Sequence, residues 1–128
     1  MTVTDFIFDH SDPQRAIMLA LYESFVGHPG VTAHIRYKIP FFYRKSWLCY
    51  LNPLRNGTVE LAFTRGDELS NAQGILDFRG RSQVASIILT TPETLPWTGL
   101  HEVFREALLL DEAQPYTHPR TRKRKNTL

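Results

Sequence analysis

The sequence has little cysteine and no long apolar run. Cys49 is the only cysteine among 128 residues, which excludes an intramolecular disulfide and a zinc site built from several thiolates. No apolar stretch approaches the ~18 residues that a membrane-spanning helix needs. Residues 1–10 lack a basic segment followed by an apolar one, so they do not have the pattern of a secretory signal. We therefore expect a protein of the cytoplasm with no membrane partner.

Catalytic and metal-binding signatures are also absent from the sequence. It has no glycine-rich phosphate loop, no serine elbow and no CxxC pair, and its five histidines are scattered without metal-ligand spacing. Cys49 lies in an apolar segment, which is typical of a buried and unreactive thiol. The sequence thus predicts no catalytic residue, no metal ligand and no cofactor. It favours a non-enzymatic protein, with an enzyme left open.

Charge divides the chain into two parts. The whole sequence holds 15 Lys and Arg residues against 13 Asp and Glu residues, for a net charge of +2. Residues 113–128 contain no acid and five basic residues: Arg120, Arg122, Lys123, Arg124 and Lys125. We therefore expect a single, slightly acidic domain over residues 1–112 and a basic, disordered tail over residues 113–128. The tail can bind phosphate backbones weakly, but its basic run contains no aromatic residue that could stack on bases.

Two segments show apolar residues at the spacing of three and four that one face of a helix requires. The first begins at Asp12-Pro13, where the aspartate is a typical N-cap and the proline suits the first helical position. It ends before Gly27 and Pro29, because glycine favours a helix end and proline cannot continue a helix. We expect helices over residues 13–26 and 98–112.

The segments between these helices have the pattern of strands. Residues 34–43 alternate in polarity, which predicts one strand with a single buried face, carrying Ile35, Tyr37, Ile39, Phe41 and Tyr43. Further strands are expected over residues 47–51, 59–63 and 83–90. Asn56-Gly57 predicts a two-residue type I′ hairpin between the first two of these. Residues 65–81 are polar and rich in glycine, and we expect a connection with about one helical turn.

Consecutive strands joined by short turns favour an antiparallel sheet, and two amphipathic helices would cover its apolar face. The sequence therefore predicts an α+β domain with an antiparallel sheet of four to five strands. Its N- and C-terminal helices are expected to pack on one face of that sheet.

Aromatic and basic residues alternate between residues 36 and 50, and two interpretations stay open. One is an ordinary strand whose aromatic face fills the core while its basic face is solvated. The other is a groove that holds a planar or anionic ligand by stacking and by cation–π contacts of about 0.5–2 kcal/mol each. The second interpretation arises because at least one residue among Phe42, Trp47 and Tyr50 must leave the core face.

We predict a non-enzymatic binding or accessory domain on the basis of this groove. Its predicted lining is Tyr37, Pro40, Phe42, Trp47 and Tyr50, with Arg36, Arg65 and Arg81 at the rim. Its expected occupant is a small molecule or a protein partner, and homo-oligomerisation is left open. Weak association of the tail with nucleic acid is an alternative.

Several short segments, in this order, carry a resemblance to a known family. They are residues 35–42, 47–51 and 59–63, then Arg65-Gly66 and Gly80-Arg81, within roughly residues 13–112. Together they resemble the domain-of-unknown-function 1801 family, also called YdhG-like, and the most specific piece is the Tyr-x-x-Pro-Phe segment that begins at Tyr37. The resemblance implies a small α+β fold with a curved antiparallel sheet, and it brings no catalytic residues.

One branch of that family is described as frataxin-like iron chaperones. Membership would imply an iron-binding role and an acidic surface. Hard cations need several carboxylate oxygens at one point, and the sequence offers only the pairs Asp67-Glu68 and Asp111-Glu112. An iron carrier is therefore a second alternative function.

Overall fold

The computed structural model describes residues 1–117, and residues 118–128, which make up most of the expected basic tail, lie outside the described residues. The helices are α1 (Val3–Phe8), α2 (Gln14–Val26) and α3 (Trp97–Ala113). The strands are β1 (Thr32–Arg36), β2 (Ile39–Tyr43), β3 (Trp47–Pro53), β4 (Val59–Phe63) and β5 (Ala85–Leu89), and short 3₁₀ turns occur at Gly66–Glu68 and Pro92–Thr94. The predicted α+β fold class is confirmed.

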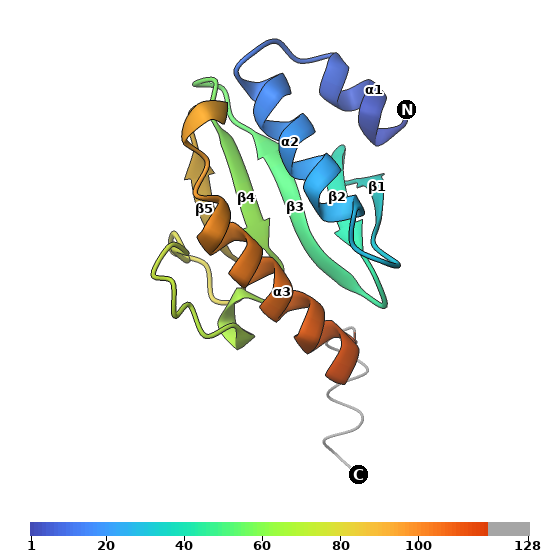
Figure 1. The fold of residues 1–128 in the computed structure, drawn as a ribbon, viewed down its shortest axis with the longest axis vertical. Helices are drawn as coiled ribbons and strands as arrows, with labels where there is room; N and C mark the ends of the chain where they lie inside the picture. The colour runs from blue at the N-terminus through green and yellow to red at the C-terminus, as the bar shows by residue number, and fades with distance from the viewer. Residues whose placement is uncertain (118–128) are drawn as a thin grey trace.

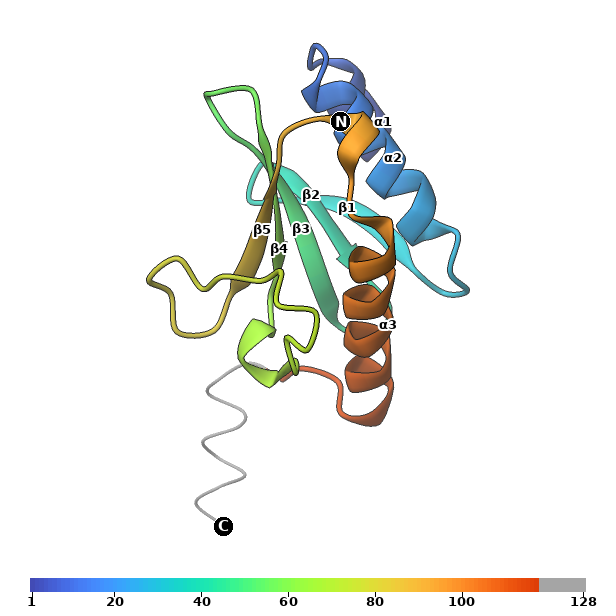
Figure 2. The same cartoon turned by 60° about the vertical axis from the view of Figure 1, so that its left-hand side comes forward.

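The five strands form one antiparallel sheet in the order β1-β2-β3-β4-β5. All three helices lie on the same side of this sheet (Figure 1 and Figure 2). We call the side under the helices the helix face and the opposite side the open face. Within residues 1–117, no helix combines the length and the apolar content needed to cross a membrane.

Three phenylalanine rings join the helices to the sheet. Phe25 of α2 stacks on Phe104 of α3 with the ring centroids 4.1 Å apart, and meets the edge of Phe42 of β2 at 5.3 Å. All three side chains are fully buried. The helix face is therefore a continuous apolar layer, which also holds Cys49, Leu51, Val59, Leu61 and Phe63.

Residues 34–43 form a hairpin and not the single strand expected from their alternation. Tyr37 and Lys38 have φ angles of 51° and 68°, and Arg36 pairs with Ile39. A two-residue loop with both φ angles positive is a type I′ turn. Because the chain reverses there, residues facing each other across the hairpin share a face of the sheet.

This reversal changes which side chains face the core. Ile35 pairs with Pro40, and His34 pairs with Phe41. Pro40 and Phe42 therefore face the helices, while Phe41 faces the opposite side. The expectation that Ile35 and Phe41 share one buried face was wrong, since alternation assigns faces correctly only within one strand.

The turn at Asn56-Gly57 is also different from the predicted type I′ turn. Only Gly57 has a positive φ, of 89°, and its N–H donates to the carbonyl of Leu54 at 3.1 Å. This is a type I turn followed by a left-handed glycine. Asn56 instead accepts from the backbone N–H of Thr58 at 3.2 Å.

The N-terminal segment adds a helix that the sequence analysis missed. Thr2 and Asp5 form a reciprocal capping box at the start of α1. The helix has six residues, too few to show helical periodicity. Its buried side chains, Val3 and Ile7, extend the core beside α2.

The domain continues past the expected boundary at residue 112. α3 runs through Ala113, and residues 114–117 leave it and contact the sheet. Only the later part of the expected tail is outside the described residues.

Candidate functional site

The open face of the sheet carries a cluster of five aromatic side chains. Phe41 lies at its centre, and its ring centroid is 4.9 Å from Tyr50, 5.7 Å from Tyr37 and 6.0 Å from Trp47. Tyr116 joins the cluster through Trp47, with the two centroids 5.3 Å apart. We call these five residues the aromatic cluster. No helix within residues 1–117 covers them, because α1, α2 and α3 all lie on the opposite side (Figure 2).

A pocket of about 350 Å³ opens beside this cluster. All five members of the cluster line it, together with Thr64, Gln83 and Val84. This volume lies within the range of about 300–1,000 Å³ that is usual for small-molecule sites. We call this cavity the open-face pocket.

The β1–β2 turn presents Tyr37 to the pocket with an unusual backbone. A bulky residue with a positive φ is uncommon, because its Cβ crowds the backbone, and type I′ turns favour Asn-Gly. Here the turn is Tyr37-Lys38, and Tyr37 is 74% exposed. The ring thus gains little burial in exchange for the strained backbone, and such strain is often found at functional sites.

An irregularity between β2 and β3 places Trp47 on the open face. Tyr43 pairs with Trp47 while Phe42 pairs with Cys49, so the register shifts by one residue. As a result Leu48 is buried in the core cluster, and its neighbour Trp47 lies beside Phe41. Without this bulge, simple alternation would put Trp47 on the same face as Cys49.

The segment after α3 supplies the last wall of the pocket. The backbone N–H of Tyr116 donates to Ser46 Oγ at 2.9 Å, and Arg65 Nη1 donates to the carbonyl of Gln114 at 2.6 Å. The Arg65 guanidinium also lies 5.8 Å from the centre of the Tyr116 ring. These contacts hold Tyr116 against Trp47.

The carboxylate of Asp111 anchors the end of α3 to the β2–β3 turn. It accepts hydrogen bonds from the backbone N–H groups of Lys45 at 2.8 Å and Ser46 at 2.9 Å, and also from the Ser46 hydroxyl. Asp111 is 1% exposed. Ser46 therefore connects Asp111 on one side with Tyr116 on the other.

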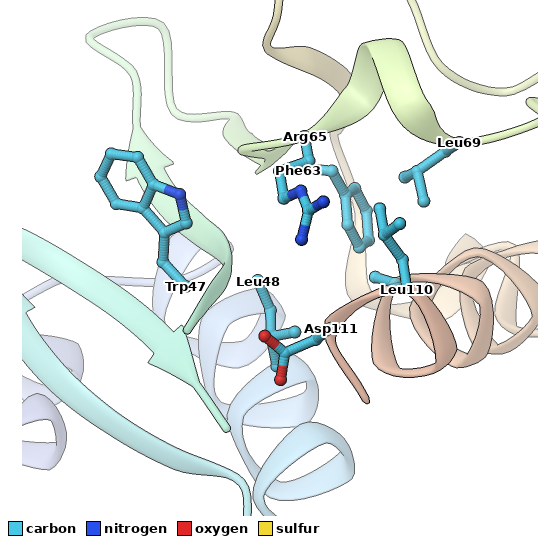
Figure 3. Close-up of a pocket in the computed structure, with 8 residues that line it drawn as sticks. Trp47, Leu48, Phe63, Arg65, Leu69, Leu110 and Asp111 are labelled. Atoms are coloured by element: carbon cyan, nitrogen blue, oxygen red, sulfur yellow. The ribbon is translucent and has the colours of Figure 1, made fainter. Parts of the chain in front are cut away.

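A small cavity of about 10 Å³ lies behind Trp47, between the sheet and α3. Its lining includes Trp47, Arg65 and Asp111 (Figure 3). The indole nitrogen of Trp47 lies on the side of the ring nearest Arg65 in this view, and it has no hydrogen-bond partner among residues 1–117. The space has room for about one water molecule, so it is too small for a ligand.

Arg81 and Glu60 form an ion pair on the open face. Arg81 Nη2 donates to Glu60 Oε2 at 2.8 Å and to Ser86 Oγ at 2.9 Å. Burial raises the pKa of Glu60, but hydrogen bonds with Ser86 and Arg81 outweigh it, so the pKa lies below its ordinary value. Burial, and then the charge of Glu60, raise the pKa of Tyr50. The phenol of Tyr50 is therefore neutral near pH 7.

The structure brings together three of the five predicted lining residues, Tyr37, Trp47 and Tyr50. The other two, Pro40 and Phe42, lie on the helix face and are buried. Phe41 takes the place that the prediction gave to Phe42, because the β1–β2 turn exchanges the two faces.

The three predicted rim arginines have different surroundings. Arg36 is exposed at the end of β1. Arg65 is 6% exposed, and its Nε donates to Glu68 at 2.7 Å. Arg81 is held by Glu60 on the open face. Tyr116 was not among the predicted residues, because the contacts that hold it come from residues far apart in the chain and leave no local pattern.

Three of the four acidic side chains in the pairs that would suit a cation have other partners. Glu68 pairs with Arg65, Asp111 caps the β2–β3 turn, and Glu112 contacts Lys45 at 3.1 Å. Among residues 1–117, no group of three His, Cys, Asp or Glu side chains is arranged to hold a metal ion. The iron-carrier hypothesis stays a prediction that rests on the resemblance alone.

A second hollow, of about 340 Å³, lies on the helix side of the molecule. His28, His101, Glu102 and Arg105 line it. His101 Nε2 is 3.2 Å from Ser24 Oγ, and His28 Nδ1 is 3.2 Å from the carbonyl of Ser24. Both rings thus have local partners, and this hollow has none of the converging apolar walls of the open-face pocket.

Comparison of the chain with protein-family models, with curated proteins and with solved structures finds no match. The resemblance to the YdhG-like family stays a prediction. Functional inference therefore depends on the geometry of the open-face pocket.

Proposed function

We propose that this protein is a non-enzymatic binding domain whose open-face pocket holds a planar ring of its ligand. The observation that carries the proposal is the convergence of five aromatic side chains on one pocket that no helix of the described residues covers. They come from the β1–β2 turn, from β2, from β3 and from the segment after α3.

The chemistry of the pocket wall favours ring binding over catalysis. Tyr37, Phe41, Trp47, Tyr50 and Tyr116 offer ring faces, and the three tyrosines also offer hydroxyl groups. Stacked or edge-to-face ring pairs contribute about 0.5–1.5 kcal/mol beyond the burial of their area. Thr64 and Gln83 supply polar atoms to the pocket lining, but the Gln83 amide already donates to the carbonyl of Thr64 at 2.8 Å. None of these groups is an activated nucleophile or a general base.

The strained turn at Tyr37 is the second support. Asparagine tolerates the positive φ of this turn better than tyrosine does. The stability of the fold therefore does not explain an exposed tyrosine at position 37. Contact between a bound ligand and the Tyr37 ring would account for tyrosine at this position.

Fluorescence of Trp47 tests the proposal. The protein has two tryptophans, and the substitution Trp97→Phe leaves Trp47, in the pocket wall, as the only one. The variant should be titrated with a set of neutral and charged planar heteroaromatic compounds, with adenosine and indole among them. We expect at least one compound to quench or shift the emission and to raise the melting temperature.

Tyr37→Asn in the same background is the matched variant, because it removes a pocket ring and suits the turn. It should weaken the response several-fold, in line with the loss of about 1 kcal/mol of stacking. The proposal is wrong if no compound changes the emission of Trp47, or if Tyr37→Asn leaves every response unaltered.

A further inference from the structure

We propose that the ligand of the open-face pocket is a planar ring that carries a negatively charged group, either a phosphate or a carboxylate. Its ring contacts the aromatic cluster, and its charged group lies beside Arg36 at the β1–β2 edge of the pocket. This inference rests on the proposed function, because it names the ligand class of the same pocket.

The rings of the aromatic cluster offer a flat ligand several faces at once. The ring plane of Phe41 makes angles of 23° with Trp47 and 31° with Tyr50. Phe41 is 4% exposed and forms the floor, whereas its neighbour Tyr37 is 74% exposed. Rings that are close to parallel present their faces in one general direction, which suits an offset-stacked planar ligand.

Strand register places Arg36 on the same face of the sheet as this floor. His34 pairs with Phe41 across the β1–β2 hairpin, and Arg36 is two residues beyond His34 in β1. Paired residues share a face of the sheet, and so do residues two apart in one strand, so all three lie on the open face. Diagonal neighbours such as Arg36 and Phe41 are roughly 7–8 Å apart, which is within reach of a long side chain. Arg36 is exposed, so its guanidinium can meet a ligand that lies over Phe41.

Tyr43 gives separate evidence that Arg36 lies close to the pocket. Burial raises the pKa of Tyr43, the charge of Arg36 lowers it to a smaller extent, and Tyr37 raises it. Arg36 and Tyr37 therefore both lie near enough to the Tyr43 phenol to act on its pKa. Because Tyr37 lines the pocket, Arg36 lies at the edge of the pocket beside it.

The β1–β2 hairpin carries positive charge that the fold does not pair. Arg36 and Lys38 flank Tyr37, both are exposed, and neither forms an ion pair within residues 1–117. A guanidinium donates charge-assisted hydrogen bonds to phosphate and carboxylate oxygens, often two in parallel. An anionic group on the ligand would therefore find donors at this edge.

Glu60 and Asp67 do not cancel this charge. Glu60 is held by Arg81, with Nη2 and Oε2 2.8 Å apart. Asp67 is exposed, and its backbone N–H donates to the carbonyl of Gln83 at 3.0 Å. Gln83 lies on the β4 side of the pocket, and β3 separates that side from the β1–β2 hairpin. The field at the hairpin edge is therefore positive.

The sign of that field favours an anionic ligand over a cationic one. Aromatic clusters can also bind cations over their ring faces. In this pocket the Arg65 guanidinium already lies 5.8 Å from the centre of the Tyr116 ring, and Arg36 and Lys38 would repel a cationic ligand at the hairpin edge. A ring with a negative group avoids both costs.

The test uses two sets of compounds, each built on one planar ring and differing in charge. The adenosine set contains 5′-amino-5′-deoxyadenosine, adenosine, adenosine-5′-carboxylate and adenosine 5′-monophosphate. The naphthalene set contains 2-naphthylmethylamine, 2-naphthalenemethanol, 2-naphthoate and 2-naphthyl phosphate. Isothermal titration calorimetry with the full-length protein at low salt measures each dissociation constant.

Within a set that binds, we expect the anionic members to bind about threefold to tenfold more tightly than the neutral member, and the cationic member to bind more weakly than it. This preference should shrink when salt is raised from about 20 mM to about 500 mM, because the Debye length falls. Comparison of phosphate with carboxylate on the same ring identifies which anionic group the edge accepts.

Substitution of Arg36 tests the position of the charged group. Arg36→Gln should remove most of the preference for anions and leave the affinity for the neutral member unchanged. Arg36→Lys keeps the charge without the planar fork and should retain part of the preference. Arg105→Gln is the control, because Arg105 is exposed on α3 on the other side of the sheet, and it should change nothing.

Three results overturn the inference. They are a cationic member that binds as tightly as the anionic ones, a preference that persists in Arg36→Gln, and a preference that Arg105→Gln removes equally well. If heteroaromatic compounds change the emission of Trp47 but no anionic member binds more tightly than its neutral partner, the inference fails while the proposed function stands. If no compound binds in any charge form, both fail.

Discussion

Phe41 and Phe42 are consecutive residues of β2 whose rings lie on opposite faces of the sheet. The Phe42 ring meets the edge of Phe25 at 5.3 Å in the core, and the Phe41 ring lies 4.9 Å from Tyr50 on the open face. This pair separates the part of the molecule that stabilises the fold from the part that we propose binds a ligand.

Phe42→Ala should lower the free energy of unfolding by about 3–5 kcal/mol, because it leaves a cavity among fully buried rings. Urea denaturation measures the change. The control is Phe78→Ala, in the connection between β4 and β5, where the ring is 38% exposed. That variant should change the free energy by no more than about 0.5 kcal/mol. Equal effects of the two substitutions would contradict the packing described for Phe42.

Tyr37→Asn should raise the free energy of unfolding by about 0.5–1 kcal/mol. Asparagine tolerates a positive φ better than tyrosine does, and the Tyr37 ring is mostly in solvent. Thermal or urea unfolding of the variant beside the native protein gives the sign. A loss of more than about 1 kcal/mol would show that the ring has a structural role that its exposure does not reveal.

Arg81→Leu should destabilise the protein by about 1–3 kcal/mol near neutral pH, because it leaves the buried Glu60 carboxylate without its charged partner. The pKa of Glu60 is lowered in the native protein, so its contribution is present above the ordinary carboxyl pKa of 4.5 and is lost as pH falls through the lowered value. In the variant this pKa should rise.

The difference in stability between the native protein and Arg81→Leu should therefore shrink as pH falls from about 7 to about 4, because a protonated Glu60 needs no charged partner. Urea titrations across this range measure it. Arg55→Leu, at an exposed position in the β3–β4 turn, is the control and should show no such dependence. A difference that stays constant with pH would rule out Glu60 as the responsible group.

Asp111→Ala should lower the free energy of unfolding by about 2–3 kcal/mol, because three hydrogen bonds to a charged acceptor are lost at a buried position. It should also shift the emission of Trp47 to longer wavelength, since Ser46 then holds Tyr116 less firmly. Glu112→Ala, whose side chain is 52% exposed and bridges Lys45, should cost less than about 1 kcal/mol. An unchanged Trp47 spectrum in Asp111→Ala would show that the Asp111 contacts with the β2–β3 turn do not influence the surroundings of Trp47 in the pocket.

Much of the fold follows from local pattern. The expected helix over residues 13–26 matches α2 closely, and the strand expected over residues 59–63 has the bounds of β4. These segments agree because their periodicity is unbroken and one face is apolar throughout. The six-residue α1 was missed, since a helix of that length shows its cap but not its period.

The candidate site was predicted only in part. Of the residues that the excess of aromatic side chains between residues 36 and 50 indicated, Tyr37, Trp47 and Tyr50 line the open-face pocket, and their role in binding stays a prediction. The prediction assigned Phe42 to the groove because alternation was read across a turn. The β1–β2 turn has Tyr-Lys in place of Asn-Gly, so nothing in its composition indicated that the chain reverses there.

By itself the sequence determined the fold class, the two longer helices that cover the sheet and the concentration of aromatic residues in one segment, because each depends on neighbours in the chain. Only the tertiary structure decided which of those rings share a face and that Tyr116 joins them. The face of the sheet on which a side chain lies depends on where the chain reverses and where a bulge shifts the register. The place of Tyr116 depends on hydrogen bonds between Ser46 and two residues more than 60 positions away, and no local pattern carries that information.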